Sequence, residues 1–216
     1  DYLFLPAGQE QAFIDAARRI VATSYPDFAR NPDYSAVVNE RHYQRLTGYL
    51  DDASAKGARL LPLAESNGAE ISRRLPPTLI LNPNDRMRVM HEEIFGPLLP
   101  VMTYERIEDA LAYINARDRP LALYLFDDDR RRIRHVLDNT IAGGVTINDT
   151  ILHIAQENLP FGGVGPSGMG HYHGHEGFLT FSKLKPVFYQ SRINAIGLFN
   201  PPYGKLFERL IRMLLR

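Results

Sequence analysis

The chain has 216 residues, with 25 Lys and Arg against 25 Asp and Glu, a formal net charge of zero and 44% hydrophobic residues. This composition predicts one large globular domain or two small ones and excludes a disordered or fibrous chain. Zero net charge gives no long-range field toward nucleic acid or an anionic membrane, and the lack of cysteine excludes disulfides, Cys-ligated zinc and a thiol nucleophile within these residues.

The first predicted elements are two amphipathic helices and a short strand. Apolar residues recur at helical spacing over residues 10–23 and again over residues 46–53. Residues 54–77 are polar and interrupted by Gly and Pro, and Thr78–Leu81 then has the pattern of a strand.

Strands and helices alternate regularly in the centre of the chain. An uninterrupted apolar run such as residues 121–126 is typical of a parallel strand covered on both faces. The alternation therefore predicts an α/β fold built around a parallel sheet. The predicted strands cover residues 99–104, 121–126 and 144–147, and the predicted helices cover residues 107–114 and 133–137.

The region after Asn148 is rich in glycine, and we expect a long loop that includes three alternating histidines. Lys185–Gln190 is a candidate for one more strand, with its Pro near the start. Residues 203–216 predict an amphipathic helix with basic residues opposite its apolar stripe. Such a helix can lie on a membrane or dock on a partner, and we favour packing on this protein's own body or on a second subunit.

The sequence from Gly163 to Gly168 satisfies the pattern G-x-G-x-x-G of dinucleotide sites. A true fingerprint follows a strand and has an acid about 20 residues on, but no Asp or Glu lies between Glu176 and Glu208. We therefore favour a loop in which glycine shapes the backbone. A nucleophilic role for Ser167 fails because Met169 stands where the motif G-x-S-x-G needs glycine.

His171, His173 and His175 alternate, and on a strand their imidazoles would share one side as in a metal site. The glycines around them disfavour a regular strand, so we expect solvated loop histidines and predict no metal site. Similarly, the three acids at 127–129 followed by three arginines at 130–132 predict a capped helix start.

Glu92 and Glu93 precede the apolar turn Ile94–Pro97. These carboxylates are either surface groups or acceptors for a sugar diol, because a pair of carboxylate oxygens matches two vicinal hydroxyls. Both interpretations stay open from the residues alone.

Three motifs together resemble the aldehyde dehydrogenases: His91–Pro97, Val145–Thr150 and Leu159–Gly170. Two further motifs, Tyr172–Gly174 and Gly177–Ser182, resemble the class that contains coniferyl aldehyde and fatty aldehyde dehydrogenases. The resemblance covers essentially the whole chain.

The resemblance implies a three-layer parallel-sheet catalytic domain of aldehyde dehydrogenase type. Residues 1–183 would be the C-terminal part of that domain, and residues 184–216 would be an oligomerisation strand and a C-terminal amphipathic helix. Asp1 would lie just past the nucleophilic cysteine, so the N-terminal cofactor-binding half, the general-base glutamate and the oxyanion asparagine would precede it. We expect the parent protein to be a cytoplasmic homodimer that binds no nucleic acid.

The implied activity is the oxidation of a hydrophobic or aromatic aldehyde, such as a coniferyl aldehyde, with NAD or NADP. In the family a thiolate attacks the aldehyde, hydride passes to the nicotinamide, and an activated water releases the acid. These residues alone are therefore expected to be inactive. The alternatives are a non-catalytic dimerisation or scaffold module that keeps the fold, and an independent nucleotide-binding protein that uses the Gly163 loop.

The resemblance assigns roles to six residues of this chain. Glu93 matches a glutamate that holds the hydroxyls of the nicotinamide ribose, and Phe95 matches an aromatic residue beside the nicotinamide. Phe161 matches a wall of the substrate channel, and Ile151 and His153 are weaker candidates for the channel mouth. Asn148 matches an asparagine below the catalytic loop, where we expect a structural hydrogen-bonding role.

Overall fold

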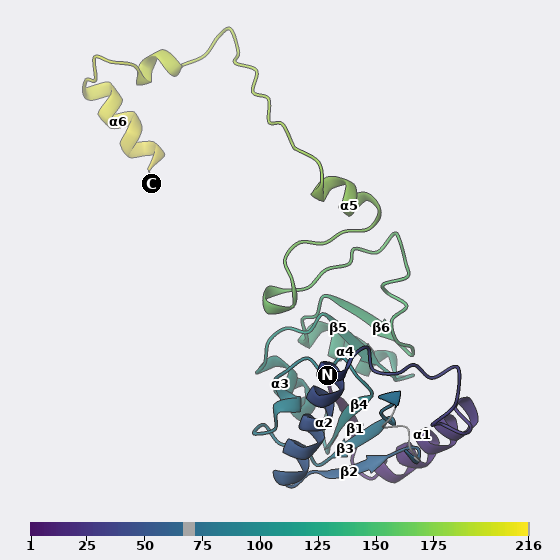
Figure 1. The fold of residues 1–216 in the computed structure, drawn as a ribbon. Helices are drawn as coiled ribbons and strands as arrows, with labels where there is room; N and C mark the ends of the chain where they lie inside the picture. Colours follow the sequence, from purple (N-terminus) through teal and green to yellow (C-terminus); the bar gives the residue numbers. More distant parts are fainter. Residues whose placement is uncertain (67–71, 216) are drawn as a thin grey trace.

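A four-stranded sheet forms the centre of the body in the order β1-β4-β3-β2 (Figure 1). The structure is a computed structural model that describes residues 1–66 and 72–215. The strands are β1 (Leu3–Pro6), β2 (Arg59–Pro62), β3 (Thr78–Leu81) and β4 (Leu98–Tyr104). β1 and β3 pair with β4 in parallel, whereas β2 pairs with β3 antiparallel. β2 lies inside the segment that the sequence predicts to be irregular.

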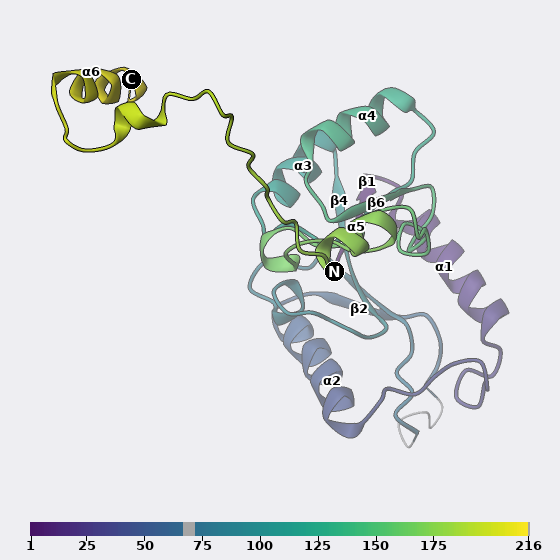
Figure 2. The same cartoon turned by 90° about the horizontal axis from the view of Figure 1, so that it is seen from above.

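Two helices cover opposite faces of this sheet, α1 (Glu10–Ser24) and α2 (Glu40–Ala55) (Figure 2). Successive residues of β3 point to opposite faces. Leu79 and Leu81 pack with Ile14 of α1, and Ile80 packs in a separate cluster with Leu46 of α2. This alternation produces a helix–sheet–helix sandwich and confirms the predicted three-layer α/β class.

The next elements build a second, two-stranded sheet. They are α3 (Ile107–Asn115), β5 (Ala122–Leu125), α4 (Arg130–Asn139) and β6 (Gly144–Ile147), and β5 pairs with β6 in parallel. The prediction that residues 121–126 are covered on both faces is wrong. Tyr124 is 40% exposed and Phe126, just after β5, is 63% exposed, so part of this apolar run faces solvent.

The start of α4 confirms the predicted helix cap. Asp129 is the N-cap residue, and its carboxylate accepts a hydrogen bond from the backbone N–H of Arg131. Asp127 receives two hydrogen bonds from Arg132, at 2.7 and 2.8 Å. Asp129 therefore satisfies one of the free N–H groups at the start of the helix, and the acids lie at the end that the macrodipole favours.

The ion pair of Asp127 and Arg132 predicts a pH-dependent stability. The hydrogen bonds from Arg132 lower the pKa of Asp127 from 3.8 to about 2. Because the folded pKa is depressed, the stabilisation is fully present above pH 3.8 and is lost as the pH falls toward 2. Arg132→Met should weaken the fall in urea midpoint across this interval. Arg130→Met, at an exposed position of the same helix, is the control, and equal pH profiles for the two variants would contradict the assignment.

The last part of the chain differs most from the sequence predictions. The expected loop contains a seven-residue helix, α5 (Gly174–Thr180), so the loop prediction is wrong there. Beyond α5 the chain leaves the body as an extended arm (Figures 1 and 2). The predicted strand Lys185–Gln190 is not formed, because an extended segment needs a neighbouring strand to complete its hydrogen bonds, and it has none among the described residues.

The arm ends in a 3₁₀ turn, η4 (Ile196–Phe199), and the predicted amphipathic helix, α6 (Lys205–Leu214). α6 packs on η4, with the rings of Phe199 and Phe207 6.4 Å apart. It does not pack on the body of the chain, which was one of the two arrangements expected from the sequence (Figure 1). Arg216, the last residue of the predicted helix, lies outside the described residues. Within residues 1–66 and 72–215, no helix combines the length and the apolar character that crossing a bilayer requires.

Candidate functional site

The turn that carries Glu93 and Phe95 lies at the amino end of β4, beside the start of β1. Leu3 of β1 is in register with Val101 of β4, and extending this register by two residues brings Asp1 level with Leu99. Asp1 and Glu93 are 92 positions apart in the sequence, and the pairing of β1 with β4 brings these distant segments to the same end of the sheet.

Both predicted cofactor residues face solvent from this turn. Phe95 is 80% exposed, and its φ angle of 46° lies in the left-handed region, which is uncommon for an aromatic residue. Glu93 is also exposed, and no ion pair of its carboxylate is found among the described residues. The same turn therefore exposes a carboxylate, which can accept hydrogen bonds, and an aromatic ring.

The rest of the turn is anchored in the core under α2. Ile94 is 1% exposed and belongs to the cluster that contains Leu46. A Cβ atom on Gly96 would lie 2.6 Å from both terminal carbons of Leu46, so the backbone passes directly over that side chain. Ile94 is thus buried between the exposed residues Glu93 and Phe95 and anchors the turn to the core.

A second group of predicted residues forms an aromatic stack around Phe161. The ring of Phe161 lies 5.7 Å from that of His173 in a stacked orientation, and 6.1 Å from that of His153. Tyr172 contacts the same ring edge to face, and a backbone bridge joins Phe161 to Tyr172. Three rings therefore pack around Phe161. His153 precedes it in the sequence, and Tyr172 and His173 follow it in the glycine-rich segment.

His153, a predicted residue of the channel mouth, has a buried side chain in this structure. The ring is 7% exposed and lies between Tyr124 and Phe161, and its Nδ1 atom is 2.9 Å from the hydroxyl of Thr146. Its ring therefore packs beside that of Phe161. Ile151, in contrast, is 60% exposed with a φ angle of 64°, so its side chain is available at the surface.

Asn148 ends β6 and ties it to the chain after β5. Its side chain accepts a hydrogen bond from the N–H of Asp127 at 2.8 Å and donates one to the carbonyl of Asp127 at 3.0 Å. The φ angle of Asn148 is 59°, a conformation that asparagine tolerates better than most residues. The residue therefore fixes the neighbouring strand ends relative to each other.

The glycine-rich loop is shaped by its own backbone. A Cβ on Gly163 would lie 2.1 Å from the carbonyl oxygen of Ser167, and the N–H of Val164 donates to the hydroxyl of Ser167. The segment 165–167 is a single 3₁₀ turn, and β6 ends well before it at Ile147. The strand–loop–helix context of a dinucleotide fingerprint is therefore missing, in line with the favoured interpretation.

The three histidines do not share one side. His173 has a φ angle of 85° and is half-buried against Phe161, so the expectation of a solvated side chain is wrong for this residue. His171 pairs with Glu176 at 2.8 Å, and His175 stacks on Phe178. Within the part of the chain that the structure describes, no three His, Cys, Asp or Glu side chains gather as a metal site would need.

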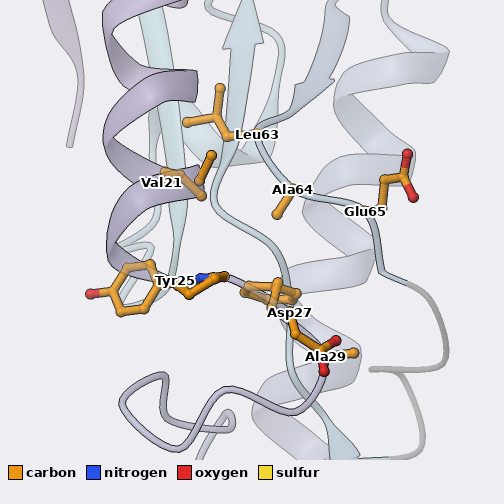
Figure 3. Close-up of a pocket in the computed structure, with 10 residues that line it drawn as sticks. Val21, Tyr25, Asp27, Ala29, Leu63, Ala64 and Glu65 are labelled. Atoms are coloured by element: carbon orange, nitrogen blue, oxygen red, sulfur yellow. The ribbon is translucent and has the colours of Figure 1, made fainter.

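Two surface pockets lie elsewhere. One, of about 270 Å³, lies between the end of α1 and the chain that follows β2, with Val21, Tyr25 and Leu63 among its lining residues (Figure 3). The other, of about 460 Å³, is lined by residues of β1, β4 and α3. Neither of these two pockets contains any of the six predicted site residues.

Sequence reasoning missed the residues that support the site. Arg45 and Tyr49 of α2 bind the turn at Glu92–Ile94, and Thr146 binds His153. The available signal was weak: Arg45 and Tyr49 are four positions apart and therefore share one helix face.

The fold and this set of motifs define the class of protein. The sequence model of the aldehyde dehydrogenase family matches residues 9–187. The chain therefore belongs to the aldehyde dehydrogenase family.

Among its relatives, a probable coniferyl aldehyde dehydrogenase of Pseudomonas aeruginosa is 56% identical over 99% of this chain and 44% of its own length. The coniferyl aldehyde dehydrogenase of a Pseudomonas species is 46% identical over 100% of this chain and 46% of its own length. A structure described as the substrate-bound state of Staphylococcus aureus AldH matches all of this chain and 46% of its own, with 36% identity and a TM-score of 0.77. The chain spans less than half the length of these relatives.

Proposed function

We propose that this chain is the C-terminal part of an NAD(P)-dependent dehydrogenase that oxidises hydrophobic or aromatic aldehydes of the coniferyl aldehyde kind. The observation that carries the proposal is the exposure of Glu93 and Phe95 on one turn at the amino end of β4, the strand that pairs with β1. The names of the two Pseudomonas relatives support the substrate class. We assign residues 1–183 to the catalytic domain and residues 184–216 to an assembly arm.

The residues of the turn fit a nicotinamide cofactor. An exposed carboxylate without an ion-pair partner among the described residues can accept hydrogen bonds from both hydroxyls of a ribose, and an exposed ring beside it can pack on a planar base. A related structure, of a Mycobacterium tuberculosis aldehyde dehydrogenase, is described as complexed with NAD⁺ and is 25% identical to this chain, with a TM-score of 0.71. When bound, the cofactor supplies the hydride acceptor, and in our proposal Glu93 holds its ribose while Phe95 orients it.

Phe161 and Ile151 suit an apolar aldehyde. Phe161 is kept in one orientation by the rings around it, and burial of an aromatic substrate against such a surface provides binding energy without directing the chemistry. We propose that both residues line the substrate channel. His153 would support the ring of Phe161, and Asn148 would hold the backbone at the end of β6.

The extended arm supports the proposal of a homodimer. Residues 185–190 have an extended backbone with open hydrogen-bonding groups, and the strand of another subunit would satisfy them. The hydrophobic residues of the arm are strongly exposed, including Phe188 at 86% and Tyr189 at 89%. Their burial at a subunit boundary would remove this surface from water.

The test of the function uses the chain with and without its upstream half. Alone, the 216-residue chain should oxidise no coniferaldehyde, because it holds no cysteine. It should also bind NAD⁺ weakly, because the proposed cofactor-binding half is not part of these residues. Joined to the family's N-terminal half, it should reduce NAD⁺ with coniferaldehyde, and thiol alkylation should abolish the reaction. Activity of the isolated chain, or an inactive but folded complete protein, would contradict the proposal; the second result would favour the scaffold interpretation.

A further inference from the structure

Arg45 on α2 holds the backbone of the turn that carries the proposed cofactor residues. Its Nη1 atom donates to the carbonyl oxygen of Glu93 at 2.8 Å, and its Nη2 atom donates to the carbonyl oxygen of Ile94 at 2.7 Å. The two acceptors are consecutive along the chain, and one planar guanidinium reaches both. A lysine ammonium has no such fork and cannot reproduce this pair of bonds in the same geometry.

Tyr49, one helical turn further along α2, links Arg45 to Glu92 by hydrogen bonds. The Tyr49 hydroxyl accepts a hydrogen bond from Nη1 of Arg45 at 2.9 Å and donates one to the carboxylate of Glu92 at 2.8 Å. The Tyr49 side chain is almost fully buried, and the guanidinium groups of Arg45 and Arg88 lie 5.2 and 5.1 Å from its ring centre. Glu92 is also bound by Arg88 at 3.0 Å.

Three consecutive residues, Glu92 to Ile94, are therefore fixed by side chains from outside the turn. The next residue, Phe95, keeps a left-handed backbone that a free aromatic residue rarely adopts. Such a conformation persists only where its surroundings impose it, and Arg45 is bound to the two carbonyls immediately before it.

We propose that Arg45, with Tyr49 as its support, is a positioning residue for the cofactor: it sets the directions of Glu93 and Phe95 and thereby the affinity for the nicotinamide ribose. This inference rests on the proposed function. Arg45 itself touches backbone carbonyls and not the ligand, so its effect on the cofactor passes through the turn.

The test is Arg45→Lys in the complete enzyme, with steady-state constants measured for both substrates. The KM for NAD should rise about tenfold, the fold-change that corresponds to about 1.4 kcal/mol of lost binding. The KM for the aldehyde should change less than about twofold, because Phe161 and Ile151 lie on other elements. Arg41→Lys, on an exposed position of the same helix, is the matched control and should leave both constants unchanged. Equal rises in both KM values would overturn the inference.

A double-mutant cycle separates positioning from general loss of structure. In a Glu93→Gln enzyme, Arg45→Lys should add little to the loss of NAD affinity, whereas additive effects would overturn the inference. If Glu93→Gln alone leaves the constants for NAD unchanged, the proposed role of Glu93 fails as well. If Glu93→Gln weakens NAD binding and Arg45→Lys does not, only the present inference fails.

Tyr49→Phe provides the second variant, because it removes one hydroxyl from a buried ring and keeps the packing. It should raise the KM for NAD by a few-fold and leave the KM for the aldehyde unchanged. Should Arg45→Lys fail to fold, an unchanged KM for NAD in Tyr49→Phe would overturn the proposal by itself.

Discussion

Glu93→Gln in the complete enzyme is expected to raise the KM for NAD about 10- to 100-fold. The carboxylate is exposed on a fixed turn, and replacing it with an amide exchanges charge-assisted hydrogen bonds to the ribose for neutral ones. Hydrogen bonds to charged groups contribute about 1.5–3 kcal/mol, and about 1.4 kcal/mol corresponds to a factor of ten. The measurement is a set of steady-state constants at saturating aldehyde, together with the dissociation constant of NADH.

The matched control is Glu105→Gln, which makes the same chemical change at an exposed position after β4. It should alter neither constant. Wild-type constants for Glu93→Gln, with both proteins equally stable, would remove Glu93 from the cofactor site and leave the carboxylate as a surface group, the alternative that the residues alone kept open.

Gly144→Ala is expected to destabilise the chain by about 1–3 kcal/mol, the usual cost of forcing an extra group into a packed site. The added Cβ would lie 2.4 Å from Cδ2 of His153, whose ring is buried and bound to Thr146. Displacement of that ring would also remove a support of Phe161. Thermal unfolding of the chain measures the effect, at about 2–4 °C per kcal/mol for a protein of this size.

Gly48→Ala, the same type of substitution, is expected to stabilise the chain. Gly48 lies inside α2, and its added Cβ meets no atom within 4 Å. Replacing glycine by alanine in a helix interior stabilises by about 0.5–1 kcal/mol. If Gly144→Ala unfolds at the same temperature as Gly48→Ala, the close packing of His153 on Gly144 does not contribute to stability as predicted.

The helices could be predicted because their periodicity extends over many residues. The predicted apolar positions of α1 and α2 recur over about two turns each, and the structure buries Val21 and Leu46 among them. Ile20, which the pattern included, is 65% exposed, and Ile14, which it left out, is buried. β2 could not be predicted, since its four residues take part in a strand only through antiparallel pairing with β3. Short strands depend on their neighbours more than on their own residues.

The same dependence explains the error at Lys185–Gln190. Its residue types suit a strand, but backbone groups in this segment find no partner strand among the described residues. For β5 the apolar run correctly indicated a parallel strand and wrongly indicated cover on both faces, because the run does not say how many layers surround it.

At the site, the motifs identified the turn of Glu93 and Phe95 but not what holds it. Arg45 is 48 residues from Glu93 in the sequence, and a charged residue on a helix is most often solvated. Only the tertiary structure places its guanidinium on two carbonyls of that turn. The burial of His153 was hidden for a similar reason, because its neighbours Tyr124 and Phe161 come from separate segments.

The separation of the arm from the body has an evolutionary consequence. Substitutions, insertions or deletions in residues 188–204 meet no packed neighbour in the body, so selection on body stability does not act on them. The family-wide sequence model ends at residue 187, near the start of the arm, while close relatives match almost to the end of the chain. Sequence divergence should therefore accumulate faster there than in the sheet, and the arm is where enzymes with one shared body can acquire different assembly properties.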